Sequence, residues 1–155
     1  MEVFPRDITL YNIVFDVLAL LGIAAAALYY FFISQITVGT RKAQLFMQLY
    51  SRFHDQDFMR RNIDIMNLEW EGFEDYWKKY GMVTNPQATS EHYSVGNFYE
   101  GIGLMVKRKL IDLEMVNDLM GGLVTRYWEK MGPVIEKQRE LFNWPGAYEW
   151  TEYLY

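Results

Sequence analysis

The chain has 155 residues, with 15 lysines and arginines against 20 aspartates and glutamates, and its formal net charge is −5 at pH 7. This balance disfavours a nucleic-acid-binding protein, which needs a basic surface against the phosphate backbone. Because cysteine is absent, disulfides, thiolate nucleophiles, iron–sulfur clusters and cysteine-ligated zinc sites are excluded.

The most apolar stretch comes first, over residues 8–38, and its centre, Val17–Ile33, has no charged, amide or hydroxyl-aliphatic side chain. A helix over residues 13–36 would be about 36 Å long, enough to cross a hydrocarbon layer about 30 Å thick. A cleaved signal peptide would need a basic leader and a shorter apolar run. A core helix of a soluble protein would be unusually long and apolar on every face. We therefore expect a transmembrane helix over residues 13–38.

The orientation of this span follows from the basic residues around it. Only Arg6 precedes the span. Five basic residues follow it closely: Arg41, Lys42, Arg52, Arg60 and Arg61. The positive-inside rule then predicts a short outer N-terminus over residues 1–12 and a cytoplasmic domain over residues 39–155.

Two features of the span concern contacts inside the membrane. Ala19, Gly22 and Ala26 lie on one helix face, an arrangement of small residues that lets membrane helices approach closely. A lipid-facing surface is the equally weighted alternative. Asp16 lies at the outer end of the span, where a carboxylate is costly inside the hydrocarbon. We expect it in the headgroup layer, and the alternative is a polar contact with another subunit.

Helical spacing of apolar residues continues to the end of the chain, and no alternating run indicates a strand. The expected helices cover residues 40–53, 57–68, 69–80 and 90–109, a segment from Asp112 to Gly121-Gly122, residues 123–131 and 133–142, and a last aromatic segment after residue 146. Asp55 or Asp57, then Thr89 or Ser90, then Asp112 are the expected N-caps. The predicted fold is all-α, with one transmembrane helix followed by a small helical bundle.

One part of the chain carries a family pattern: a helix with phenylalanine and glutamate, a turn of the form ID-L-E-x-V, a tryptophan-containing helix, then proline and arginine. The matching residues are Phe98, Glu100, Gly103, Ile111, Asp112, Val116, Trp128, Pro133, Ile135 and Arg139. Over roughly residues 41–155 the chain resembles domain-of-unknown-function family 4760. The resemblance implies a membrane-anchored helical domain and no activity.

The sequence contains no recognisable catalytic motif. Neither His54 nor His92 stands three residues after a glutamate, as a di-iron carboxylate bundle requires. Gly96, Gly101 and Gly103 lie inside a helical pattern without a preceding strand, which favours close helix packing over a nucleotide loop. The acidic residues between positions 69 and 75 indicate a solvated helix face. We therefore expect no enzyme, no metal site and no cofactor.

Five side chains of the predicted domain are candidates for structural or partner contacts. Glu100 lies among residues expected to be buried, where a carboxylate needs a partner, and Arg126 or Arg139 could form an ion pair with it. A catalytic role is the weaker alternative. Trp144 and Trp150 are candidates for a partner contact, because exposed aromatic residues are enriched at interfaces. Docking on the protein's own domain is the alternative.

These observations favour a non-catalytic, single-span accessory or scaffolding subunit of a larger membrane protein assembly. Its expected partners are the lipid bilayer and other membrane protein subunits or further copies of the chain. The alternative is a membrane-tethered regulator or sensor whose cytoplasmic domain binds a ligand or partner.

Overall fold

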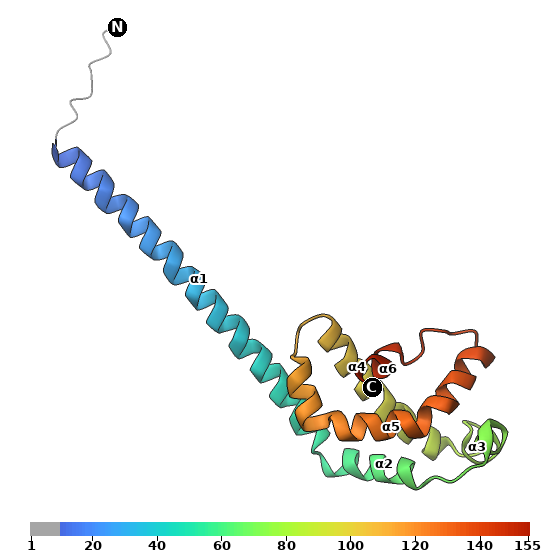
Figure 1. Cartoon of the computed structure of the whole chain (residues 1–155). Helices are drawn as coiled ribbons and strands as arrows, with labels where there is room; N and C mark the ends of the chain where they lie inside the picture. The colour runs from blue at the N-terminus through green and yellow to red at the C-terminus, as the bar shows by residue number, and fades with distance from the viewer. Residues whose placement is uncertain (1–9) are drawn as a thin grey trace. The chain divides into compact units, whose positions relative to one another are not determined.

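The computed structural model describes residues 10–155, and these residues form six helices and no strand (Figure 1). The helices are α1 (Leu10–Phe53), α2 (Gln56–Asn67), α3 (Gly72–Tyr80), α4 (Pro86–Lys107), α5 (Leu113–Leu141) and α6 (Glu149–Leu154). The all-α prediction is therefore confirmed. The chain divides into two compact units, Met1–Arg41 and Lys42–Tyr155. Most of the expected outer N-terminus, residues 1–9, lies outside the described residues.

The first unit contains the apolar part of α1. Every side chain from residue 10 to residue 41 is exposed, although most of them are apolar. A helix satisfies its backbone hydrogen bonds internally, so such a segment is compatible with a hydrocarbon environment. α1 is long and apolar enough to cross a membrane, and it contains the predicted span. The expected continuation past Gly39 is confirmed, since α1 ends at Phe53.

The second unit is a helical bundle in which α2, α3 and α6 each pack against both α4 and α5. Figure 1 shows these helices gathered around α4 and α5. Its core is rich in aromatic residues, with Tyr99 of α4 and Tyr127 of α5 fully buried and in edge-to-face contact. Phe46 and Phe53, from the last part of α1, are also buried in this core. Much of the aromatic surplus of the sequence is therefore used in packing.

Two of the expected N-caps are confirmed by their hydrogen bonds. Asp55 accepts from the backbone N–H of Asp57 at 3.0 Å at the start of α2. Asp112 accepts from the N–H of Glu114 at 3.0 Å at the start of α5. Both carboxylates satisfy backbone donors that the first helical turn leaves without a partner.

The expected start of α4 at Thr89 or Ser90 is wrong, because the helix begins at Pro86. Asn85 is the N-cap, and its side chain accepts from the N–H of Ala88 at 3.0 Å. The residue before a proline avoids helical geometry, and proline itself suits the first helical position. Thr89 lies inside the first turn and donates its hydroxyl to the carbonyl of Tyr80 at 2.9 Å.

The expected breaks at Gly121-Gly122 and before Pro133 are also wrong, because α5 is one helix from Leu113 to Leu141. Buried side chains recur along its whole length, from Val116 to Gln138, so packing on the bundle holds it together. Proline inside a helix removes one hydrogen bond and bends the axis. Figure 1 shows α5 changing direction along its course.

Candidate functional site

One face of α4 receives the C-terminal segment of the chain. Gly96 and Gly103 lie on this face with Glu100 between them, at helical spacing of four and three residues. A Cβ atom at Gly103 would collide with the backbone of Trp150, and one at Gly96 would collide with Tyr127 and Tyr148. The expected close packing is therefore confirmed at both glycines. It is wrong for Gly101, where an added Cβ would meet nothing within 4 Å.

The carboxylate of Glu100 holds the start of α6. It accepts hydrogen bonds from the backbone N–H groups of Trp150 at 3.3 Å and Thr151 at 2.8 Å, and from the Thr151 hydroxyl at 2.9 Å. Tyr148, the N-cap residue of α6, makes no capping hydrogen bond with its own side chain. Glu100 therefore supplies, from another helix, the acceptor and the negative charge that a helix start favours.

The expected ion pair between Glu100 and Arg126 or Arg139 is not formed. Arg139 pairs instead with Glu152 of α6 at 2.8 Å, and its Nε donates to the carbonyl of Ala147 at 2.8 Å. Arg126 is exposed and forms no ion pair within residues 10–155. The physical reason is that three donors of α6 already satisfy the Glu100 carboxylate.

The two candidate contact tryptophans differ in their surroundings. Trp150 is half-buried, because its backbone rests on Gly103 and its ring lies 6.3 Å from that of Tyr153. The structure therefore shows Trp150 docked on the protein's own domain, which is the alternative to a partner contact. Trp144 is 64% exposed. A partner contact at Trp144 stays a prediction.

A cavity of about 290 Å³ lies between α4, the end of α5 and the segment that leads to α6. Aromatic side chains form much of its wall, with a few polar groups among them: Tyr93, Phe142, Trp144, Tyr148, Asn97 and Glu100. Tyr148 has a φ of +56°, a left-handed conformation that is strained for a bulky residue. Burial raises the pKa of Tyr148, so its hydroxyl stays protonated at neutral pH. No local pattern in the sequence indicates this cavity, because its wall comes from three separate segments.

His92 lies beside the cavity, with its ring 5.7 Å from that of Tyr148, and it is buried. Its Nδ1 is hydrogen-bonded to the Tyr127 hydroxyl at 3.0 Å, and its Nε2 has no partner among the described residues. Burial lowers the pKa of His92 to about 4, so the ring is neutral at pH 7. Residues 10–155 contain no group of three histidine, aspartate or glutamate side chains arranged for a metal ion.

The predicted intramembrane residues lie in the first unit. Ala19, Gly22, Ala26 and Asp16 are all on α1 and all exposed. Among the described residues, no atom outside the adjoining part of α1 lies within 4 Å of the position of a Cβ at Gly22. The small-residue face is thus open to a neighbouring helix or to lipid. Its use in assembly and the headgroup position of Asp16 stay predictions.

A family model described as "Domain of unknown function (DUF4760)" matches residues 17–155. No curated protein and no solved structure matches the chain.

Proposed function

The chain belongs to the DUF4760 family, and from that premise we propose that it is a single-span membrane protein acting as a non-catalytic accessory or scaffolding subunit of a larger membrane assembly. The observation that carries the proposal is the exposed apolar surface of α1. Leu20, Leu21 and Ile23 are all more than half exposed. Burial of apolar surface gains about 25 cal/mol per Å², so lipid or protein must cover this helix. Large exposed apolar patches mark such interaction sites.

The orientation in this proposal places the N-terminus outside and the second unit in the cytoplasm. It rests on the excess of lysine and arginine after the span, from Arg41 onward. The covering partners are the bilayer itself and, on the face of Ala19, Gly22 and Ala26, either another membrane subunit or a second copy of the chain.

A non-catalytic role is supported by what the polar groups of the second unit do. The Glu100 carboxylate is used to hold α6, and His92 is buried, neutral and bonded to Tyr127. General acid–base catalysis needs a titratable group with a pKa near the working pH and within reach of a substrate. The pKa of the buried His92 lies well below neutral pH, and the Glu100 carboxylate is already engaged by three hydrogen-bond donors.

The test is to extract the full chain from its native membrane in mild detergent and measure the mass of the intact particle. We expect other membrane proteins in fixed stoichiometry. Gly22→Ile should reduce their recovery by placing a branched side chain on the small-residue face, whereas Leu28→Ile, on the opposite face, should not. A particle containing only this chain, or recovery equal in the two variants, would contradict the accessory role through this face.

A second candidate function, a ligand-responsive regulator, is favoured by the cavity beside Tyr148. Its volume of about 290 Å³ is near the lower end for small-molecule sites, and its wall combines aromatic surface with a few polar groups. Trp144 lies in this wall and is a built-in fluorescent reporter. Saturable quenching of its fluorescence by a cellular small molecule, abolished in Trp144→Phe, would support the regulator. A response unchanged in Trp144→Phe would count against this cavity.

A further inference from the structure

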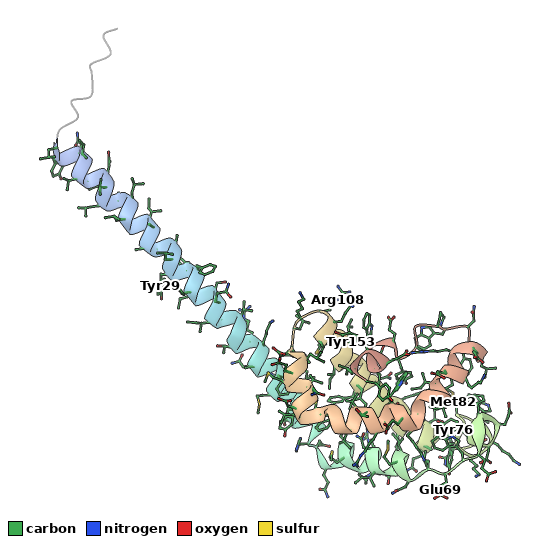
Figure 2. The ribbon with its side chains drawn as sticks, in the orientation of Figure 1. Tyr29, Glu69, Tyr76, Met82, Arg108 and Tyr153 are labelled. Carbon is green, nitrogen blue, oxygen red and sulfur yellow. The ribbon has the colours of Figure 1, made fainter. Side chains whose placement is uncertain are left out.

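The turn between α4 and α5 concentrates positive charge on an acidic protein. Lys107, Arg108 and Lys109 are consecutive and exposed, and Leu110 follows them with 49% of its surface exposed. We call Lys107–Leu110 the basic turn. Figure 2 shows Arg108 and Tyr153 at one end of the second unit, away from Glu69 and Met82. A chain with a net charge of −5 thus has one strongly basic corner.

The basic turn lies beside the residue at which the second unit begins. Lys42 and Lys109 line the same surface cavity of about 310 Å³, together with Leu113. Lys42 follows Val38, the last residue of the proposed span, by four positions. At about 1.5 Å per residue along a helix, this separation is about 6 Å. Lys42 is the first residue of the second unit, so the corner that contains Lys42 and Lys109 is the part of that unit to which the chain connects the span.

The charges of this corner are not neutralised within the protein. Among residues 10–155, none of Lys42, Lys107, Arg108 and Lys109 forms an ion pair, whereas five other basic residues do. The carboxylate of Asp112 lines the same cavity and caps α5, and its single negative charge offsets only part of the four positive charges without pairing with any of them. Lys107 lies over the rings of Trp150 and Tyr153, at 5.9 and 5.3 Å, contacts that leave its charge uncompensated.

The backbone of the turn holds these side chains outward. The N–H of Leu110 donates to the carbonyl of Met105 and the N–H of Lys109 to that of Val106, each at 2.9 Å, which together form a Schellman motif. Lys109 has a φ of +58°, at the position that glycine usually occupies. A strained lysine at this position is an outlier of the kind found at functional sites.

We infer that the basic turn and Lys42 form a membrane-surface contact for anionic lipid headgroups of the bilayer that α1 crosses. Lysine and arginine next to a span are attracted by the negative potential of an anionic leaflet. Leu110 and Leu113 are the apolar side chains of the same corner that enter the interfacial layer. The contact fixes one end of the second unit against the membrane. This inference rests on the proposed membrane anchor.

The absence of cysteine allows a site-specific test on the full chain. A spin label at Leu110→Cys reports depth, through its relative exposure to oxygen and to a water-soluble nickel chelate. The protein is reconstituted in vesicles of phosphatidylcholine, with or without phosphatidylglycerol. Leu21→Cys reports the apolar part of α1, and Val83→Cys, 95% exposed between α3 and α4, reports water.

We expect the label at position 110 to enter the interface when phosphatidylglycerol is present and to be water-exposed without it. In the protein labelled at position 110, in vesicles with phosphatidylglycerol, Arg108→Gln should lower the ratio of interfacial to water-exposed label about fivefold. The reason is that one basic residue near an anionic surface contributes about 1 kcal/mol. Lys78→Gln, an exposed lysine on α3, is the matched control and should leave the ratio unchanged.

The outcomes separate the contact from the anchor. If the label at position 110 matches that at position 83 in both vesicles while the label at position 21 is in lipid, the contact is overturned and the anchor stands. Equal insertion in both vesicles overturns the requirement for anionic headgroups. A water-exposed label at position 21 overturns the anchor, and the contact with it. Shielding of position 110 only after an acidic protein is added overturns the lipid contact.

Discussion

The docking of α6 should depend on one carboxylate, and Glu100→Ala tests this directly. The substitution leaves two backbone N–H groups and the hydroxyl of Thr151 without their acceptor. Thr151 is 0% exposed, so its donors cannot turn to water while α6 remains docked. α6 has only six residues, too few to stay helical without tertiary contacts. We therefore expect α6 to open before the rest of the bundle unfolds.

The size of the effect follows from the number and kind of the bonds. A hydrogen bond to a charged group contributes about 1.5–3 kcal/mol, and contributions within one cluster are not additive. Glu100 is itself half-buried, so water replaces part of what is lost. We expect the free energy of opening α6 to fall by about 2–4 kcal/mol, which corresponds to a rise of roughly 30-fold to several hundred-fold in the opening equilibrium.

Hydrogen exchange of the amides of Trp150 and Thr151, in the full chain in micelles, measures this equilibrium. Glu149→Ala is the matched control, because it removes an exposed glutamate from the first turn of α6. Glu100→Gln should fall between the two, since its amide oxygen still accepts but the charge is lost. Exchange in Glu100→Ala no faster than in Glu149→Ala would refute the assignment of Glu100 as the group that holds α6.

Three further predictions concern stability in thermal or denaturant unfolding of the full chain in micelles. Gly103→Ala should destabilise the domain by displacing the α6 backbone. Gly101→Ala, with open space around it, should stabilise α4 by up to about 1 kcal/mol. Equal changes in the free energy of unfolding for the two variants would contradict the docking of α6 on Gly103. Lys109→Gly should raise the free energy of unfolding by about 1 kcal/mol by relieving the left-handed backbone, and a loss of stability would contradict the strain. Burial lowers the pKa of His92 from 6.5 in the unfolded chain to about 4 in the folded chain. As the pH falls, this histidine is therefore protonated in the unfolded chain before it is protonated in the folded chain. Stability should therefore be at its full value above pH 6.5 and should decline as the pH falls toward 4. His92→Gln should make this decline shallower, and an unchanged pH profile in His92→Gln would contradict this cause.

Local signals in the sequence predicted the elements with the strongest short-range chemistry. Asp55 and Asp112 are caps because a carboxylate just before a helix meets donors two residues on, whatever the rest of the chain does. The apolar part of α1 is predicted by a similarly local property, because the length and hydropathy of one continuous run of residues indicate the helix. α4 starts earlier than predicted because Asn85 caps the helix and Pro86 supplies its first residue.

The partner of Glu100 could not be predicted from the sequence, for a different reason. A half-buried carboxylate needs a partner, and the sequence favours arginine in this role. Its donors instead come from residues 150 and 151, about fifty positions further along the chain, and two of them are backbone groups that have no sequence signature. The same holds for the cavity beside Tyr148, whose wall is assembled from α4, α5 and the segment before α6.

By itself the sequence determined the class of this protein: a long apolar helix at the start, an all-α remainder, and the residues that cap α2 and α5. These properties depend on side chains a few positions apart, where spacing and chemistry act directly. Only the tertiary structure decided that α5 is continuous through two glycines and a proline, that Gly96 and Gly103 make room for a returning chain, and that Glu100 closes α6. Those outcomes depend on contacts between distant segments, and packing overrides local preference where such contacts are buried.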